Sequence, residues 1–263
     1  MAMNPKIYDW HGKRVWILGA SSGIGEALAR ALTAHGARVA VSARRTAMLT
    51  KLVNEFPCDL GLALPCDGGK PAEVAAAMAT LQKNWGGVDL AIYAAGIWEP
   101  ASADNFTPAQ IDSTLDINLR APMHFAQQIV PQLLAQGSGA VAFISSVAGY
   151  RPLPKALLYG TSKAALNYFA GALHIDLAPR GIGVFLINPG FVETPMTVAN
   201  RFTMPAIISA ERAAQEILDG FAAGDFEIHF PKRFTRSLRA LGWLPDAFYY
   251  PLVRKMGGKP HGG

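Results

Sequence analysis

The sequence predicts one doubly wound α/β domain, with a parallel sheet of about seven strands and helices on both faces of that sheet. With 263 residues the chain is too short for two full domains, and a content of 51% hydrophobic and 16% charged residues is typical of a compact globule. Short apolar runs alternate with longer Ala- and Leu-rich stretches, with no internal repeat or linker between them. Strands that are apolar along their whole length are typical of a parallel sheet covered on both faces.

Six strand-then-helix units follow one another along the chain. The six predicted strands are residues 13–19, 38–43, 60–64, 88–96, 139–146 and 181–190, and residues 226–230 (FEIHF) are a candidate seventh. The predicted helices are residues 26–36, 45–56, 71–85, 108–136 and the stretch that contains Tyr159. We therefore predict a catalytic domain at residues 1–230 and an extension at residues 231–263. In such folds ligands bind at the carboxyl ends of the strands, where the candidate functional residues are expected.

The first predicted strand leads into the loop GASSGIG, residues 19–25, directly before a helix. Glycines let the backbone turn tightly and approach a pyrophosphate, whose charge then faces the helix N-terminus. A glycine run alone fits a plain turn equally well, but its place between the first strand and the first helix favours a dinucleotide site. The spacing is GxxxGxG, and no Lys-Ser/Thr follows as in a P-loop. The expected cofactor contacts in this loop are Gly19, Ser21, Ser22, Gly23, Ile24 and Gly25.

The end of the second predicted strand indicates which dinucleotide is bound. An NAD site has an acidic residue at this point to bind the ribose hydroxyls, whereas this chain has Arg44 and Arg45. A guanidinium pairs with a 2′-phosphate in a forked geometry, so NADP is favoured over NAD, the alternative being two solvated arginines. Asp67, after the third strand, is either an acceptor for the adenine amine or a turn aspartate.

Tyr159 and Lys163 lie four residues apart in a stretch with helical period, and therefore on one face of that helix. An acid or base that works near neutral pH needs the phenol pKa to drop by about three units from ~10, which is roughly 4 kcal/mol. A positive charge ~4 Å away at an effective dielectric of about 20 supplies around 4 kcal/mol. The pair therefore suits proton transfer, although most pairs with this spacing only decorate a helix, and Tyr168 is expected to be structural.

These motifs together resemble the short-chain dehydrogenase/reductase family, in that family's order, over roughly residues 10–230. The matching segments are GASSGIG at 19–25, AAG at 94–96, INL at 117–119, ISS at 144–146, YGTSK at 159–163 and NPGFVET at 188–194. The resemblance implies a Rossmann-type fold and a catalytic set of Asn118, Ser146, Tyr159 and Lys163. By the same resemblance Ser146 orients the substrate oxygen, Asn118 holds a relay water, and Lys163 also binds the nicotinamide ribose. The further cofactor contacts are Ala95, Gly96, Pro189, Gly190, Val192 and Thr194.

Two positions depart from the family pattern. The family usually has a threonine before its first glycine and an asparagine before its AAG, where this chain has Leu18 and Tyr93. Because the strands that end in these residues are expected to be neighbours, we predict that packing between Leu18 and Tyr93 replaces a polar contact.

The segment after the sixth predicted strand is rich in Phe, Met and Pro, which is typical of a lid over an apolar pocket. A helical insertion that packs on the core is the alternative. The residues expected to contact substrate are Trp98, Tyr150, Met196, Phe202 and Met204.

The net charge of +5 is concentrated near the C-terminus. Residues 230–259 contain seven basic residues and one acidic residue, so this segment carries +6 and the rest of the chain carries −1. The body is close to neutral, which argues against a nucleic-acid partner. Phe234, Leu238 and Leu241 share one helical face in the tail, which leaves three partners open: an anionic membrane surface, the domain itself or a second subunit. The last residues, GGKPHGG, are expected to be disordered.

The sequence therefore predicts an NADP-dependent oxidoreductase that acts on a hydrophobic ketone, aldehyde or secondary alcohol. The alternative is a dinucleotide-binding regulator or scaffold without turnover. The two cysteines, Cys58 and Cys66, have no metal-site spacing, and the start of the chain lacks a signal segment, so we expect a reducing cytoplasm and no metal. The family resemblance implies a homodimer or homotetramer.

Overall fold

A computed structural model describes residues 2–198 and 204–256 of the chain. Its centre is a seven-stranded sheet in which every neighbouring pair of strands is parallel, in the order β3-β2-β1-β4-β5-β6-β7. The strands are β1 (Arg14–Leu18), β2 (Arg38–Ser42), β3 (Gly61–Ala63), β4 (Leu90–Tyr93), β5 (Ala140–Ile144), β6 (Gly183–Pro189) and β7 (Glu227–Phe230). The predicted fold class is confirmed, including the seventh strand.

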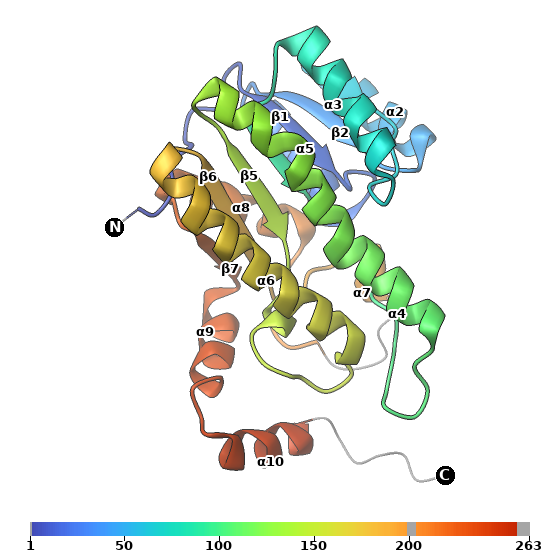
Figure 1. The fold of residues 1–263 in the computed structure, drawn as a ribbon, viewed down its shortest axis with the longest axis vertical. Helices are drawn as coiled ribbons and strands as arrows, with labels where there is room; N and C mark the ends of the chain where they lie inside the picture. The colour runs from blue at the N-terminus through green and yellow to red at the C-terminus, as the bar shows by residue number, and fades with distance from the viewer. Residues whose placement is uncertain (1, 199–203, 257–263) are drawn as a thin grey trace.

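Helices cover both faces of the sheet, as the continuous apolar strands require. The helices are α1 (Gly23–Ala34), α2 (Thr46–Asn54), α3 (Pro71–Trp85), α4 (Pro108–Leu115), α5 (Ala121–Gln136), α6 (Leu157–Leu177), α7 (Pro195–Val198), α8 (Ala210–Ala223), α9 (Lys232–Leu241) and α10 (Asp246–Met256). Figure 1 shows α5 and α6 crossing in front of the sheet and α8 behind it. Along β1, Val15 and Ile17 pack towards α1 and α8, while Trp16 and Leu18 pack towards α3 and α5. Neither face of the sheet is left to water.

The strand order places the binding crevice. The chain leaves β1 towards β2 on one side and later returns to β4 on the other, so the connections diverge at the carboxyl ends of β1 and β4. In open parallel sheets this switch point is where ligands bind. The glycine loop after β1 and the AAG segment after β4 therefore meet at one place.

Leu18 and Tyr93 are paired residues on the adjacent strands β1 and β4, so the predicted neighbourhood of the two departures is confirmed. Both side chains are buried, and the Tyr93 ring lies edge-on to Phe125 with ring centroids 5.6 Å apart. The Tyr93 hydroxyl also donates a hydrogen bond of 2.9 Å to the carbonyl of Ile117. Packing of Leu18 and Tyr93 thus replaces the polar contact expected between these strands. The Tyr93 hydroxyl makes a different polar contact, with a π-helical turn at Asp116–Arg120.

The C-terminal extension folds as two helices, and its predicted start at residue 231 falls between β7 and α9. The apolar face of α9 packs on the domain: Phe234 lies against Phe191, and the buried Thr235 is hydrogen bonded to His229. The division into residues 1–230 and 231–263 stays a prediction, and the segment GGKPHGG lies outside the described residues.

In the described part of the chain no helix is both long and apolar enough to cross a bilayer. Among the same residues no three His, Cys, Asp or Glu side chains are grouped as a metal site would need.

Candidate active site

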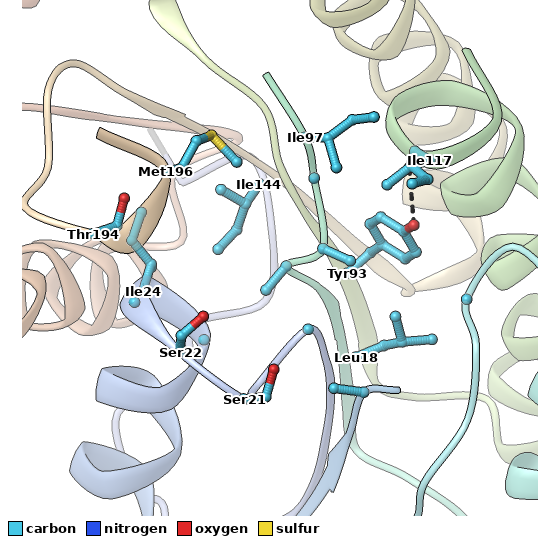
Figure 2. Close-up of a pocket in the computed structure, with 18 of the residues that line it drawn as sticks. Leu18, Ser21, Ser22, Ile24, Tyr93, Ile97, Ile117, Ile144, Thr194 and Met196 are labelled. Atoms are coloured by element: carbon cyan, nitrogen blue, oxygen red, sulfur yellow. Dashed lines mark hydrogen bonds between the residues drawn. The ribbon is translucent and has the colours of Figure 1, made fainter. Parts of the chain in front are cut away.

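A cavity of about 360 Å³ opens at the carboxyl ends of β1, β4, β5 and β6. The segments that line it are the glycine loop, the ends of β2 and β4, the β5 end, the first turns of α6 and the loop after β6. They correspond to residues 18–25, 43–45, 66–69, 93–97, 117, 144–146, 159, 163 and 189–197, with some gaps. Figure 2 shows Ser21 and Ser22 at one end, with Met196, Ile144 and Ile97 towards the other.

The glycine loop is packed so closely that side chains would not fit at two of its glycines. Gly19 has φ +103°, and a Cβ there would lie 2.3 Å from the backbone nitrogen of Ala95. A Cβ on Gly25 would lie 2.3 Å from the carbonyl oxygen of Gly19. No side chain caps the N-terminus of α1 at Ser22, so the first backbone N–H groups of the helix face the cavity without a side-chain acceptor. This cradle fits the pyrophosphate of a dinucleotide.

Arg44 and Arg45 are exposed residues at the rim of the same end. The Arg45 guanidinium donates hydrogen bonds of 2.9 Å to the hydroxyls of both Ser21 and Ser22, and so lies over the glycine loop. Asp67 is the one acidic side chain among the described lining residues, and its carboxylate accepts a bond of 3.0 Å from the N–H of Gly69. This end of the cavity is therefore predominantly cationic.

Ser146, Tyr159 and Lys163 meet at the opposite end of the cavity. Ser146 follows β5, and the other two lie one turn apart on α6. The Ser146 hydroxyl lies close enough to the Tyr159 hydroxyl to affect its pKa. The Lys163 ammonium donates a bond of 3.0 Å to the carbonyl of Ile144 and lies 5.6 Å from the centre of the Tyr159 ring. The spacing of residues in the sequence therefore does bring these three groups together.

Burial has the largest effect on the pKa values of Tyr159 and Lys163. It raises the pKa of Tyr159, while the nearby Ser146 hydroxyl acts in the opposite direction. It also lowers the pKa of Lys163 from 10.5 to about 8. The expected drop of the Tyr159 pKa by the lysine charge is therefore wrong for this arrangement, because desolvation of the phenol outweighs the effects that lower its pKa. A phenol that keeps its proton at neutral pH is a proton donor.

A family model described as short chain dehydrogenase matches residues 13–204. The chain belongs to the short-chain dehydrogenase family. A relative described as an uncharacterized oxidoreductase of Myxococcus xanthus is 30% identical over 246 residues, which cover 91% of this chain and 96% of the relative. Another so described, from Staphylococcus aureus strain N315, is 32% identical over 183 residues, covering 70% and 79%. The protein is thus an oxidoreductase.

Solved structures of the family have the same fold. A 3-ketoacyl-(acyl-carrier-protein) reductase of Brucella melitensis, complexed with NADH, matches with a TM-score of 0.77 and 25% identity, covering 85% of this chain and 99% of that one. A short-chain dehydrogenase of Sphingobium yanoikuyae, in complex with NADPH, matches with a TM-score of 0.78 and 24% identity, covering 95% and 98%.

Asn118 of this dehydrogenase lies in the π-helical turn and is fully buried. Its side-chain amide exchanges two hydrogen bonds of 2.9 Å with the backbone of Ile97 and donates a third, of 3.2 Å, to the hydroxyl of Ser162. A Cβ on Gly96 would lie 3.3 Å from the Asn118 carbonyl oxygen and 3.7 Å from the Lys163 ammonium nitrogen. Asn118 thus fixes the chain at the end of β4, and its relay of protons stays a prediction.

Ser145 and Ser146 are distinguished as the alternation along a strand predicts. The Ser145 hydroxyl donates a bond of 3.3 Å to the backbone carbonyl of Lys163 and so braces α6 against β5. The Ser146 hydroxyl accepts a bond of 3.1 Å from the backbone N–H of Ala148 and lies near the Tyr159 hydroxyl.

The predicted substrate residues are divided by the structure. Met196 lines the cavity, as does Thr194, whereas Trp98 and Met204 are not among the described lining residues. Tyr150 does not line it either, because its hydroxyl donates a hydrogen bond to the carboxylate of Glu227 instead. Phe202 lies outside the described residues. The apolar side chains that do line this end, Ile97, Ile117 and Ile144, were not selected from the sequence.

A polar network behind Ser146 also escaped the sequence analysis. The Ser146 N–H donates a bond of 3.1 Å to the side-chain oxygen of Asn188, whose amide donates one of 2.9 Å to Glu227. The Glu227 carboxylate also accepts from Tyr150 and lies 3.2 Å from the guanidinium of Arg239 in α9. The signal available in the sequence was Glu227, the one acidic residue of the predicted strand at residues 226–230.

Proposed function

We propose that this dehydrogenase is NADP-dependent and transfers a hydride between the nicotinamide and a hydrophobic ketone, aldehyde or secondary alcohol. One observation carries the proposal: Ser146, Tyr159 and Lys163 line the same cavity as the glycine loop. A proton-transfer group and a cradle for phosphate are thus within one continuous space, as a reaction that moves a hydride and a proton together requires.

Ser146, Tyr159 and Lys163 have separate roles in proton transfer. The Ser146 hydroxyl holds the substrate oxygen beside the Tyr159 phenol, whose pKa it already affects. Tyr159, half-buried and protonated, donates its proton to the oxygen as negative charge develops there, and takes it back in the reverse direction. Lys163, with a pKa of about 8, keeps its charge at neutral pH and stabilises the phenolate left behind. Bound in this cavity, the nicotinamide supplies or accepts the hydride.

The preference for NADP rests on the charge at the glycine-loop end. Arg44 and Arg45 lie at the rim of the cavity, and Arg45 bonds to Ser21 and Ser22 of the glycine loop, so these two side chains would supply the cation that a ribose 2′-phosphate needs. Replacing both arginines by alanine is expected to raise KM for NADPH at least about tenfold and to leave KM for NADH within a factor of about two. An equal rise of both constants would contradict the preference.

The proposed substrate class rests on the side chains near Tyr159. Ile97, Ile144 and Met196 line the cavity there, so an apolar substituent would replace water beside apolar carbons. The test is NADPH consumption with a panel of ketones and aldehydes of increasing apolar size. We expect turnover that increases with apolar size. Binding of NADPH without turnover of any member of the panel would favour a non-catalytic regulator instead.

The cytoplasmic location and the homo-oligomeric state stay predictions from the sequence. Both cysteines are free thiols, Cys58 exposed and Cys66 buried, which supports a reducing compartment.

A further inference from the structure

The outer face of α10, together with the turn before it, is an apolar surface. Trp243 is 90% exposed, Phe248 66% and Leu252 44%. Phe248 and Leu252 lie one turn apart and therefore share a face of the helix. We name these three residues the α10 face. Exposed apolar side chains of this size, gathered on one element, are typical of an interaction surface.

The α10 face is held in a fixed orientation, because the opposite side of the helix is docked on the catalytic domain. Tyr249 and Val253 point inward and are 1% and 6% exposed. The Tyr249 hydroxyl donates a bond of 2.8 Å to the carbonyl of Pro152. Phe248 and Leu252 are thus turned away from the domain by the docking itself.

Arg151 fixes the turn between α9 and α10. Its guanidinium donates bonds of 3.0 Å and 2.7 Å to the carbonyls of Gly242 and Leu244, and it pairs with Asp246 at 2.5 Å. It also stacks over the Tyr249 ring, 3.8 Å from the ring centre. These contacts fix the position of the turn that carries Trp243. They also pair Asp246, the one acidic residue of the extension, with Arg151.

The extension that carries the α10 face is strongly basic. Residues 231–256 contain six basic residues and one acidic residue, Asp246, which is paired with Arg151. Among the basic side chains, Arg233, Arg236, Arg254 and Lys255 are exposed. A surface that combines exposed Trp, Phe and Leu with Lys and Arg matches the boundary between the headgroups and acyl chains of an anionic lipid layer.

A second copy of the chain is a poorer match for this face. A two-fold contact would place the same face of each subunit against the other and bring two clusters of like charge together. Lipid headgroups supply the opposite charge, and the acyl region accepts the three apolar side chains.

The position of α10 in the fold is compatible with an anionic lipid surface as its partner. In Figure 1 α10 lies beyond the carboxyl ends of the strands, on the side of the molecule where the cavity opens. We propose that the α10 face, with Arg254 and Lys255, binds the surface of an anionic lipid bilayer without crossing it. This interaction is independent of the proposed reaction and can be tested without a substrate.

The test is sedimentation of the full chain with vesicles of phosphatidylcholine alone or of equal parts phosphatidylcholine and phosphatidylglycerol. We expect binding to the anionic vesicles, and a weaker partition by about fivefold for each of Arg254→Gln and Lys255→Gln. The double variant Trp243→Ser, Phe248→Ser should partition at least about tenfold more weakly. The control replaces two exposed aromatic residues elsewhere, Tyr8→Ser and Tyr168→Ser, and should bind as the wild type does.

Three results would overturn the proposal. The first is wild-type protein that stays in the supernatant with anionic vesicles or binds neutral vesicles equally well. The second is a smaller particle for the Trp243→Ser, Phe248→Ser variant than for the wild type in sedimentation velocity without lipid, which would make the face a subunit interface. The third is binding to an RNA homopolymer that needs Arg254 and Lys255 but neither Trp243 nor Phe248.

Discussion

The glycine-loop wall of the cavity and the C-terminal extension are held in place by different means. The wall is backbone against backbone: Gly19 meets the chain at Ala95, and Gly25 meets Gly19. The extension is attached by side chains far apart in sequence, with Arg151 holding the turn before α10 and Glu227 holding Arg239 of α9.

The two regions therefore differ in the amino-acid substitutions that they tolerate. A wall made of close backbone contacts fails when a single atom is added, because nothing nearby can rotate away. An extension held by long side chains is destabilised gradually, because each side-chain contact can be removed separately.

Gly19→Ala is expected to have the largest effect on folding. The new Cβ would overlap the backbone at Ala95 and would require a non-glycine residue at φ +103°. We expect the free energy of unfolding to fall by about 4 kcal/mol or more, measured by urea denaturation. Gly137→Ala is the matched control, since Gly137 also has positive φ but has open space around it, and it should cost about 1 kcal/mol. Equal losses for the two variants would contradict the backbone contact.

Lys163 should make stability depend on alkaline pH. Burial lowers its pKa to about 8 from 10.5, so below pH 8 the folded state carries the full cost of a buried charge. Between these two values the unfolded chain binds more protons, and the wild type gains stability as the pH rises. The advantage in unfolding free energy of Lys163→Met over the wild type should therefore shrink by about 3 kcal/mol from pH 7 to above pH 10. A difference that does not change with pH would show that Lys163 is not buried in its charged form.

Glu227→Ala should weaken the link between the extension and Ser146. Without the carboxylate, the Asn188 amide that orients the Ser146 backbone loses its acceptor. We expect kcat to fall about tenfold with KM for NADPH unchanged, because the glycine-loop wall is not involved. Glu227→Gln is the control, since its amide oxygen can still accept from Asn188, and it should recover most of the rate. A loss that is equal for both variants would assign the effect to the charge pair with Arg239.

Tyr93→Phe tests the smallest of these effects. It removes the hydroxyl that donates to the Ile117 carbonyl and keeps the ring that packs on Phe125. We expect the free energy of unfolding to fall by about 1 kcal/mol, measured by thermal denaturation. Tyr168→Phe, at an 82% exposed site, should leave stability unchanged. No difference between the two variants would mean that the hydrogen bond adds nothing to packing.

The sequence was sufficient wherever structure follows from neighbouring residues. Continuous apolar runs predicted the strands, and one helical turn between Tyr159 and Lys163 placed them on one face. The order of motifs brought Gly19 and Ala95 to the same edge of the sheet because the parallel fold aligns all strand ends.

The rest depended on contacts between distant side chains. Tyr150 comes soon after Ser146 in the sequence, which suggested that it lines the cleft. Its hydroxyl instead donates a hydrogen bond to Glu227, 77 residues later in the chain. The Tyr159 pKa was misjudged because sequence spacing indicates a nearby charge and says nothing of desolvation. Likewise, nothing local shows that Arg151 holds residues 242–246.

The most direct test of the proposed reaction is a comparison of wild type with Tyr159→Phe, in which NADPH binding is followed by fluorescence and turnover by NADPH consumption. Phenylalanine keeps the aromatic ring and removes only the proton donor. We predict that NADPH binds equally to both proteins, while turnover of the best carbonyl substrate falls by about 10³-fold. Turnover that survives in Tyr159→Phe would contradict the role of Tyr159 as the proton donor.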